Sequence, residues 1–186
     1  MGSSPQACVA RVAPGGLLVF FPSYGALSSA VTAWKADGSW GRIAALKPLF
    51  EEPREAALFP PARAAFQAAL DAPRSGGACF LAVCRGKASE GMNVRNIHTF
   101  LLFSNSPCIP SQFSDAAGRV VVVTGIPYAS ATDPKVALKR AFLDRLARAP
   151  AAPGSPRCVD GSAWYAQGAL RAVNQALGYA HHLSTL

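Results

Sequence analysis

Three short, uninterrupted runs of apolar residues constrain the fold more than any other feature of the chain. They are Leu17–Phe21, Cys79–Cys84 and Val120–Thr124. A strand with one solvated face alternates apolar and polar residues, whereas continuous runs of this length are typical of strands buried on both faces, as in a parallel sheet. The sequence therefore predicts a parallel sheet that needs cover on both sides.

Segments with helical spacing of apolar residues lie between and after these strands. We expect helices at Ala26–Trp34, Ala62–Ala72, Pro134–Arg148 and Ala163–Leu177. Asp133 stands before the third helix, whose first residue is proline, and Ser162 stands before the fourth; both are residue types that cap helix N-termini. Strands separated by helices predict an α/β fold built around one parallel sheet.

Composition excludes several classes of protein. A chain that is 51% apolar and 15% charged is not disordered. No apolar run reaches the roughly 18 residues that a membrane-spanning helix needs, and the first residues lack the pattern of a secretion signal. The formal net charge of +8 favours a polyanionic partner such as nucleic acid.

The five cysteines are an odd number, widely spread and without a C-x-x-C pair. This pattern supports neither a disulfide framework nor a zinc site, and it indicates a reduced, intracellular chain. Cys79 and Cys84 flank an apolar run, so we expect both to be small buried core residues. No metal site is predicted, and the His181–His182 pair is interpreted as solvated.

Two turns that carry reactive groups follow predicted strands directly. Pro22-Ser23-Tyr24 comes after the first strand, and the segment Arg85–Gly91 comes after the second. Ligands of parallel sheets bind at the carboxyl ends of the strands. In this second segment Arg85 and Lys87 can bind phosphate oxygens, and its two glycines let backbone N–H groups approach a phosphate closely. The segment is not a Walker A loop, and a plain solvated turn is the alternative interpretation.

Further segments join these two in a defined order. They are Gly16–Tyr24, Ala45–Phe50, Phe80–Gly91, Val123–Tyr128, Leu138–Arg140, Trp164–Tyr165 and Ala172–Gly178. Together they resemble the second motor domain of the superfamily-two DNA helicases of the XPD and DinG type, and within it the regulator of telomere elongation helicase branch. The resemblance covers about residues 16–178 and implies a RecA-like parallel sheet flanked by helices.

The resemblance also implies roles for particular residues. Ser23 and Tyr24 match motif IV, which lines the path of single-stranded DNA, and Arg85 and Lys87 open motif V, which couples that path to the nucleotide. For binding ATP it implies Glu90, Gly91, Gln175 and Gly178, the last two from the start of motif VI. Stacking aromatics and backbone-tracking cations are what a single strand requires. Alternatively, Tyr24 is a packing residue at a helix entry, and Gln175 is an ordinary exposed helix residue.

The same resemblance implies an activity and its partners. We expect the C-terminal motor domain of an ATP-dependent DNA helicase, with 5′→3′ polarity, that acts in the nucleus in DNA repair and genome maintenance. ATP and Mg²⁺ would be held mainly by the first motor domain of the same helicase, the family's iron–sulfur cluster lies outside this chain, and no membrane is involved. The alternative is a non-catalytic nucleic-acid-binding or interaction fragment of such a helicase.

The chain departs from the family inside motif V. Relatives read Ser-Glu-Gly-Leu-Asp-Phe-Ser-Asp, whereas here Asn93 and Phe113 are separated by the 19 residues Val94–Gln112, which contain no Ala or Gly. We hypothesise that this interval is translated from a retained intron, and spliced transcripts would decide it. The alternative is a surface insertion, because long loops cost little closure entropy. Asn93 also replaces the family's aspartate.

The C-terminal part departs as well. After Gly178 relatives carry two arginines and a last sheet strand, whereas this chain ends Tyr-Ala-His-His-Leu-Ser-Thr-Leu. Arginine is not replaced by Tyr or His in a fork that binds phosphate oxygens. We therefore expect an incomplete sheet, a fragment or faulty gene model, and no ATPase activity of the chain alone. The predicted division is an N-terminal extension (1–15), the motor domain (16–178) and a divergent tail (179–186).

Overall fold

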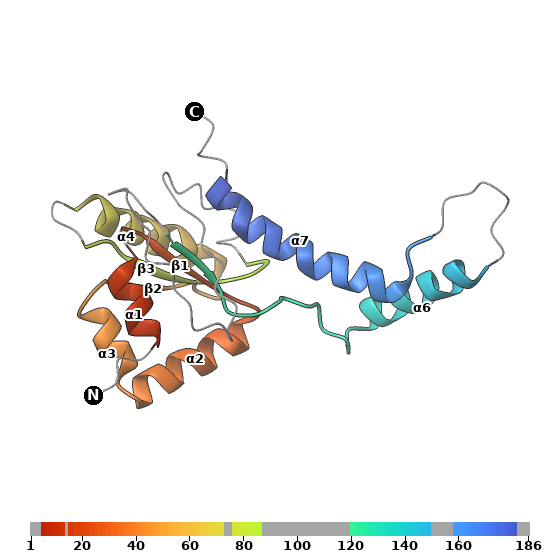
Figure 1. The fold of residues 1–186 in the computed structure, drawn as a ribbon, viewed down its shortest axis with the longest axis horizontal. Helices are drawn as coiled ribbons and strands as arrows, with labels where there is room; N and C mark the ends of the chain where they lie inside the picture. The colour runs from red at the N-terminus through yellow and green to blue at the C-terminus, as the bar shows by residue number, and fades with distance from the viewer. Residues whose placement is uncertain (1–4, 14, 73–75, 87–119, 150–157, 182–186) are drawn as a thin grey trace.

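The computed structural model describes residues 5–13, 15–72, 76–86, 120–149 and 158–181, with side chains from residue 9 to residue 175. Four strands form one sheet in the order β2-β3-β1-β4, and every neighbouring pair is parallel (Figure 1). The strands are β1 (Leu17–Phe21), β2 (Leu49–Glu51), β3 (Cys79–Val83) and β4 (Val120–Val123). The three predicted strands and the α/β fold class are confirmed.

One face of the sheet packs against α4 (Phe59–Asp71). Leu18 and Phe20 of β1 point to this face, and the ring of Phe66 lies 5.3 Å from that of Phe80, edge to face. Tilted aromatic pairs at such distances add to the energy of burying their area. α4 is therefore held mainly by aromatic packing. It covers the predicted helix Ala62–Ala72 except for Ala72, which follows the end of α4 with an extended backbone.

The other face is covered by α1 (Pro5–Val12), α2 (Tyr24–Ala36) and α3 (Ser39–Ala44). Successive residues of a strand point to opposite sides, so Leu17 and Val19 of β1 pack here. Leu27 of α2 and Ile43 of α3 are buried against them. Because helices cover both faces of the sheet, every side chain of a central strand is buried, and this explains why these strands are apolar throughout.

α6 (Pro134–Arg148) and α7 (Gly161–His181) form a helical hairpin that projects from the β4 side of the sheet (Figure 1). The Asp133 carboxylate accepts from the Lys135 N–H at 2.8 Å, so the predicted cap of α6 is confirmed. For α7 the predicted cap, Ser162, is wrong. Asp160 accepts from the Ala163 N–H at 2.7 Å, because the helix begins at Gly161, two residues earlier than a Ser162 cap would require.

Two buried cysteines complete the core. Cys79 and Cys84 are buried and free, which confirms the prediction that they are core residues. Burial raises the pKa of the Cys84 thiol to about 11, so the thiol stays protonated at neutral pH. Among the described helices, none combines the length and the hydropathy needed to cross a bilayer.

Candidate nucleic-acid and nucleotide interface

The two turns with reactive side chains leave the same edge of the sheet. β1 and β3 are neighbours in parallel register, with Phe21 opposite Val83. One residue further, the Cys84 N–H donates to the Phe21 carbonyl at 2.8 Å. The turns that begin at Pro22 and Cys84 therefore lie side by side at the carboxyl edge, where the sequence predicts them.

Ser23 is exposed and caps α2. Its backbone is extended, with φ −158° and ψ 162°, and its Oγ accepts from the Ala26 N–H at 3.1 Å. The hydroxyl oxygen thus satisfies one of the donors that a helix start leaves without an intrahelical partner. Its own O–H points to no acceptor among the hydrogen bonds of the described residues, and it can donate to a phosphate oxygen.

Tyr24 is half-buried and crosses the end of β3. Its hydroxyl donates to Glu52 Oε1 at 2.8 Å, and the guanidinium of Arg54 lies 5.4 Å from its ring centroid. Burial, together with the hydrogen bond to Glu52 and the charge of Glu52, raises the pKa of Tyr24 to about 12. Tyr24 is therefore an uncharged phenol whose hydroxyl is held by Glu52 and whose ring lies beside the guanidinium of Arg54.

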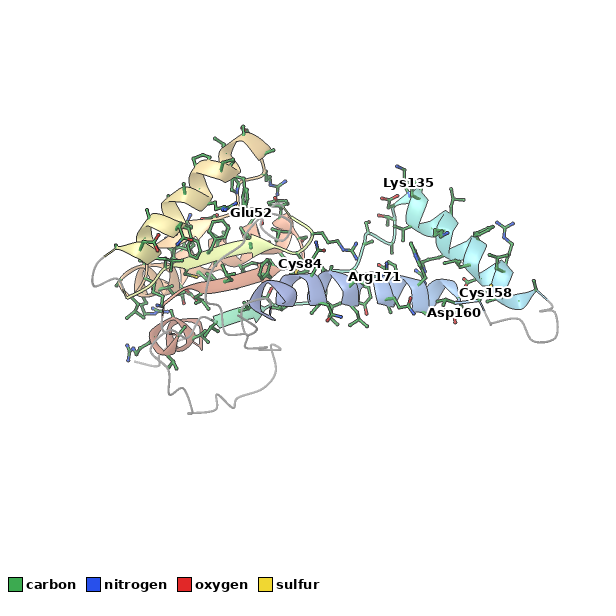
Figure 2. The ribbon with its side chains drawn as sticks, turned by 90° about the horizontal axis from the view of Figure 1, so that it is seen from above. Glu52, Cys84, Lys135, Cys158, Asp160 and Arg171 are labelled. Carbon is green, nitrogen blue, oxygen red and sulfur yellow. The ribbon has the colours of Figure 1, made fainter. Side chains whose placement is uncertain are left out.

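Glu52 is the site residue that sequence reasoning missed. It follows β2 directly (Figure 2). Only 3% of its surface is exposed. Its backbone N–H donates to the Leu81 carbonyl at 2.8 Å, and its Oε2 accepts from the Val83 N–H at 2.9 Å. Its carboxylate therefore binds the end of β3 with one oxygen and Tyr24 with the other.

Arg85 is exposed and stands in the left-handed region of backbone conformation, with φ 62°. This region costs a residue other than glycine of order 1 kcal/mol. Its Nη2 donates to the carbonyl of Gly168 in α7 at 2.6 Å. Arginine carries five N–H donors, so this bond orients the side chain and leaves further donors for an anion.

The predicted nucleotide residues are only partly covered by the structure. Gln175 is exposed on α7, seven residues beyond Gly168 and so on the same side of the helix, and Gly178 lies one turn later. Within the described part of the chain, no hydrogen bond joins Gln175 to either turn. Lys87, Glu90, Gly91 and the interval 94–112 lie outside the described residues.

The comparison with protein families decides what kind of domain carries this edge. Residues 7–103 and 111–181 match the family described as "Helicase C-terminal domain". The chain belongs to this helicase family. The resemblance inferred from the motifs is thereby confirmed. Residues 104–110, which the match omits, fall inside Val94–Gln112, the interval interpreted above as an insertion in motif V.

Individual relatives point to the same branch of helicases. The chain is 45% identical over 170 residues to the regulator of telomere elongation helicase 1 of Rattus norvegicus and to that of Homo sapiens. In both cases 91% of this chain aligns with 12% of the relative. The Arabidopsis thaliana homolog is 44% identical over 176 residues, which are 90% of this chain and 15% of the homolog. The chain thus spans a small part of the relatives' length.

Proposed function

We propose that this helicase domain holds single-stranded DNA across the carboxyl edge of its sheet. Ser23, Tyr24 and Arg85 supply a hydroxyl, an aromatic ring and a guanidinium at adjacent strand ends, and Lys87 adds a second cation by its place in the motif. A single strand is bound by rings that stack on bases and by cations that follow the phosphates. The observation that supports this most is the parallel register of β1 and β3, which brings the two turns to one edge.

The same proposal assigns the nucleotide to a neighbouring surface. Glu90, Gly91, Gln175 and Gly178 would face an ATP crevice whose other wall is the first motor domain of the same helicase. Among the described residues of this set, Gln175 offers an exposed amide, which fits a phosphate or ribose contact. ATP with Mg²⁺ supplies phosphoryl transfer when both domains are present. The family's iron–sulfur cluster lies outside this chain.

The biological setting belongs to the proposal too. The relatives are named regulators of telomere elongation. From the family resemblance we propose a nuclear DNA helicase that acts in genome maintenance and repair, with 5′→3′ polarity. The chain alone contains no G-x-x-x-x-G-K-[ST] loop. We therefore propose that it binds DNA without hydrolysing ATP, which makes a non-catalytic DNA-binding role the second candidate.

A binding titration with a salt series tests this function. A fluorescent dT oligonucleotide is titrated with the 186-residue chain, and ATP turnover is measured with and without the oligonucleotide. We expect affinity that falls as salt rises, with a log–log slope of about −0.7 for each phosphate neutralised, and no turnover. Arg85→Ala should weaken binding and flatten the slope by roughly that amount.

Lys35→Ala is the matched control for charge. Lys35 lies in the last turn of α2, about 16 Å along the helix from Tyr24 at 1.5 Å per residue. Its removal should leave the affinity within about twofold, since exposed charges beyond a Debye length of about 8–10 Å are screened. Equal losses in the two variants, or no binding at all by the unchanged chain, would refute the proposed edge.

A further inference from the structure

The carboxylate of Glu52 lies between the two turns and contacts both. Tyr24 is attached to β1 and Val83 ends β3, yet both donate to this one side chain, at 2.8 Å and 2.9 Å. Glu52 itself belongs to the segment after β2. One buried group thus connects the segments that follow β1 and β2 to the last residue of β3, the strand between them.

The bond to Val83 has a particular place in the sheet. In a parallel ladder the N–H and C=O groups of one strand bond to evenly spaced partners on the next. The Glu52 N–H continues this ladder to the Leu81 carbonyl, but the next donor, the Val83 N–H, is taken by the Glu52 side chain. The carboxylate therefore ends the pairing of β2 with β3 and fixes where the turn at Cys84 begins.

The turn that carries Arg85 also approaches this carboxylate. A Cβ placed on Gly86 would lie 2.4 Å from Glu52 Oε1 and 2.8 Å from the Val83 carbonyl oxygen. Real Cβ atoms do not come so close, so the backbone at Gly86 is packed directly on the oxygen that also accepts from Tyr24. A change in the position of one turn must displace the oxygen that holds the other.

A buried carboxylate is costly unless hydrogen bonds compensate for its lost hydration. A group used only to terminate the sheet would need a single acceptor for one N–H, and a backbone carbonyl supplies that. Here the second oxygen is directed to the hydroxyl of the residue proposed to stack on DNA. We propose, resting on the DNA site inferred above, that Glu52 is a positioning residue that holds the Tyr24 ring and the Arg85 turn as one unit.

A double-mutant cycle on DNA affinity tests this coupling. Glu52→Ala and Tyr24→Phe each remove the hydrogen bond between the two residues, so each should weaken binding of the dT oligonucleotide to the chain by about tenfold, the effect of one charge-assisted hydrogen bond. Because they remove the same bond, the double variant should bind no more weakly than Glu52→Ala alone. If Tyr24→Phe weakens DNA binding by the same factor in the wild-type chain and in Glu52→Ala, the two residues act independently and the proposal is overturned.

Three further variants separate positioning from folding. Glu51→Ala is the matched control, since Glu51 is the exposed neighbour in β2, and its affinity should stay within about twofold. Glu52→Gln keeps the shape and can still accept from Val83 while donating to the Tyr24 oxygen, so it should restore most of the affinity. If Glu52→Ala does not fold, Glu52→Met, which fills the space without an acceptor, takes its place in the cycle.

A spectroscopic measurement keeps the inference testable apart from DNA binding. In the chain labelled with ¹³C at tyrosine Cζ, the pKa of Tyr24 should lie near 12 and be lower in Glu52→Gln, which removes the charge of Glu52 while the phenol stays buried. Hydrogen exchange at the Val83 amide should speed up in Glu52→Ala. If the unchanged chain binds no oligonucleotide, the DNA site is refuted, and these two readouts still decide whether Glu52 holds both turns. An unchanged Tyr24 pKa together with unchanged Val83 exchange would overturn the coupling.

Discussion

At the scale of single residues, the close packing of the carboxyl edge restricts which side chains can occupy positions 85 and 86. Gly86 packs against Glu52 Oε1, the oxygen that accepts from the Tyr24 hydroxyl. Arg85 has a strained backbone with positive φ, and its side chain donates a hydrogen bond to Gly168 in α7. Strained residues persist only where the surrounding structure determines them strongly. Here the strain falls on the residue that presents the exposed cation.

Replacing Gly86 by alanine should destabilise the domain by about 1–3 kcal/mol, the usual cost of forcing extra volume into a packed site. The new methyl group would meet Glu52 Oε1, which accepts from Tyr24, and the Val83 carbonyl, which accepts from the Gly86 N–H, and neither can move away without breaking that hydrogen bond. Urea unfolding monitored by circular dichroism measures the change.

Gly41→Ala is the control for this substitution. Gly41 lies inside α3, and a Cβ there meets nothing within 4 Å. The alanine should stabilise the helix by about 0.5–1 kcal/mol through backbone entropy and helix propensity. If Gly86→Ala proves as stable as Gly41→Ala, the close packing at the edge is wrong.

The raised pKa of Tyr24 predicts a pH dependence of stability. Burial, followed by the hydrogen bond to Glu52 and its charge, raises this pKa to about 12, whereas the unfolded chain has about 10. Between these values the folded state binds more protons, so stability falls as pH rises. The contribution of Tyr24 is fully present below pH 10 and is lost as pH approaches 12. Arg54, beside the ring, acts in the opposite direction.

Tyr24→Phe isolates this contribution from the other groups that titrate at high pH. Urea unfolding of both proteins at several pH values between 9 and 12 should show the stability difference between wild type and variant shrinking as pH rises. If the stability difference stays constant from pH 9 to pH 12, the pKa of Tyr24 is not raised on folding, and the buried hydrogen bond to Glu52 is wrong.

At the scale of elements, the start of α2 combines a structural and a proposed binding role in one side chain. Ser23 caps the helix with its oxygen, and its hydroxyl proton is the part that could reach a phosphate. The two roles use different atoms of one group, so suitable substitutions can separate them.

Ser23→Ala should cost about 1 kcal/mol of stability, because the Ala26 N–H loses its cap. Ser23→Asp keeps a capping oxygen and places a negative charge at the helix N-terminus, where it is favourable, so stability should be retained. Its charge would repel phosphates, and affinity for the dT oligonucleotide should fall. Undiminished affinity of the aspartate variant would place the strand away from α2.

Elements with strong local patterns were predictable from the sequence. The apolar runs placed β1, β3 and β4, and Asp133 followed by Pro134 gave the bounds of α6 as they are found. β2 was not predicted, because a strand of three residues that ends in glutamate has too short a pattern to distinguish it from a loop. α1 and α3 were also missed, since short helices rely on tertiary packing rather than on their own propensity.

The candidate site was predictable only in part. Ser23, Tyr24 and Arg85 were found because they follow apolar strands, which puts them at a known edge. Glu52 was not, because Glu51 and Glu52 look alike in the sequence and only the pleat of β2 makes one exposed and the other buried. Alternation along a strand contains this information, but it can be used only once the strand is recognised.

At the scale of the whole molecule, the two edges of the sheet differ in how they use charge. At the amino edge Lys47 is buried, and its Nζ donates to the carbonyls of Gly15, at 2.8 Å, and Gly76. Burial lowers the pKa of this lysine. Its ammonium group therefore serves the fold, whereas at the carboxyl edge Arg85 is exposed to solvent. This asymmetry favours the carboxyl edge as the surface for a polyanion.

Mapping of amide shifts by NMR shows where on the domain single-stranded DNA binds. The ¹⁵N-labelled chain is titrated with unlabelled dT oligonucleotide, and changes are assigned residue by residue. We expect the largest shifts at Ser23–Gly25 and Cys84–Gly86, with little change at Gly15–Leu17 and Gly76–Ala78. Shifts concentrated at the amino edge or on the basic helix α6, with the Ser23 and Arg85 turns unaffected, would contradict it.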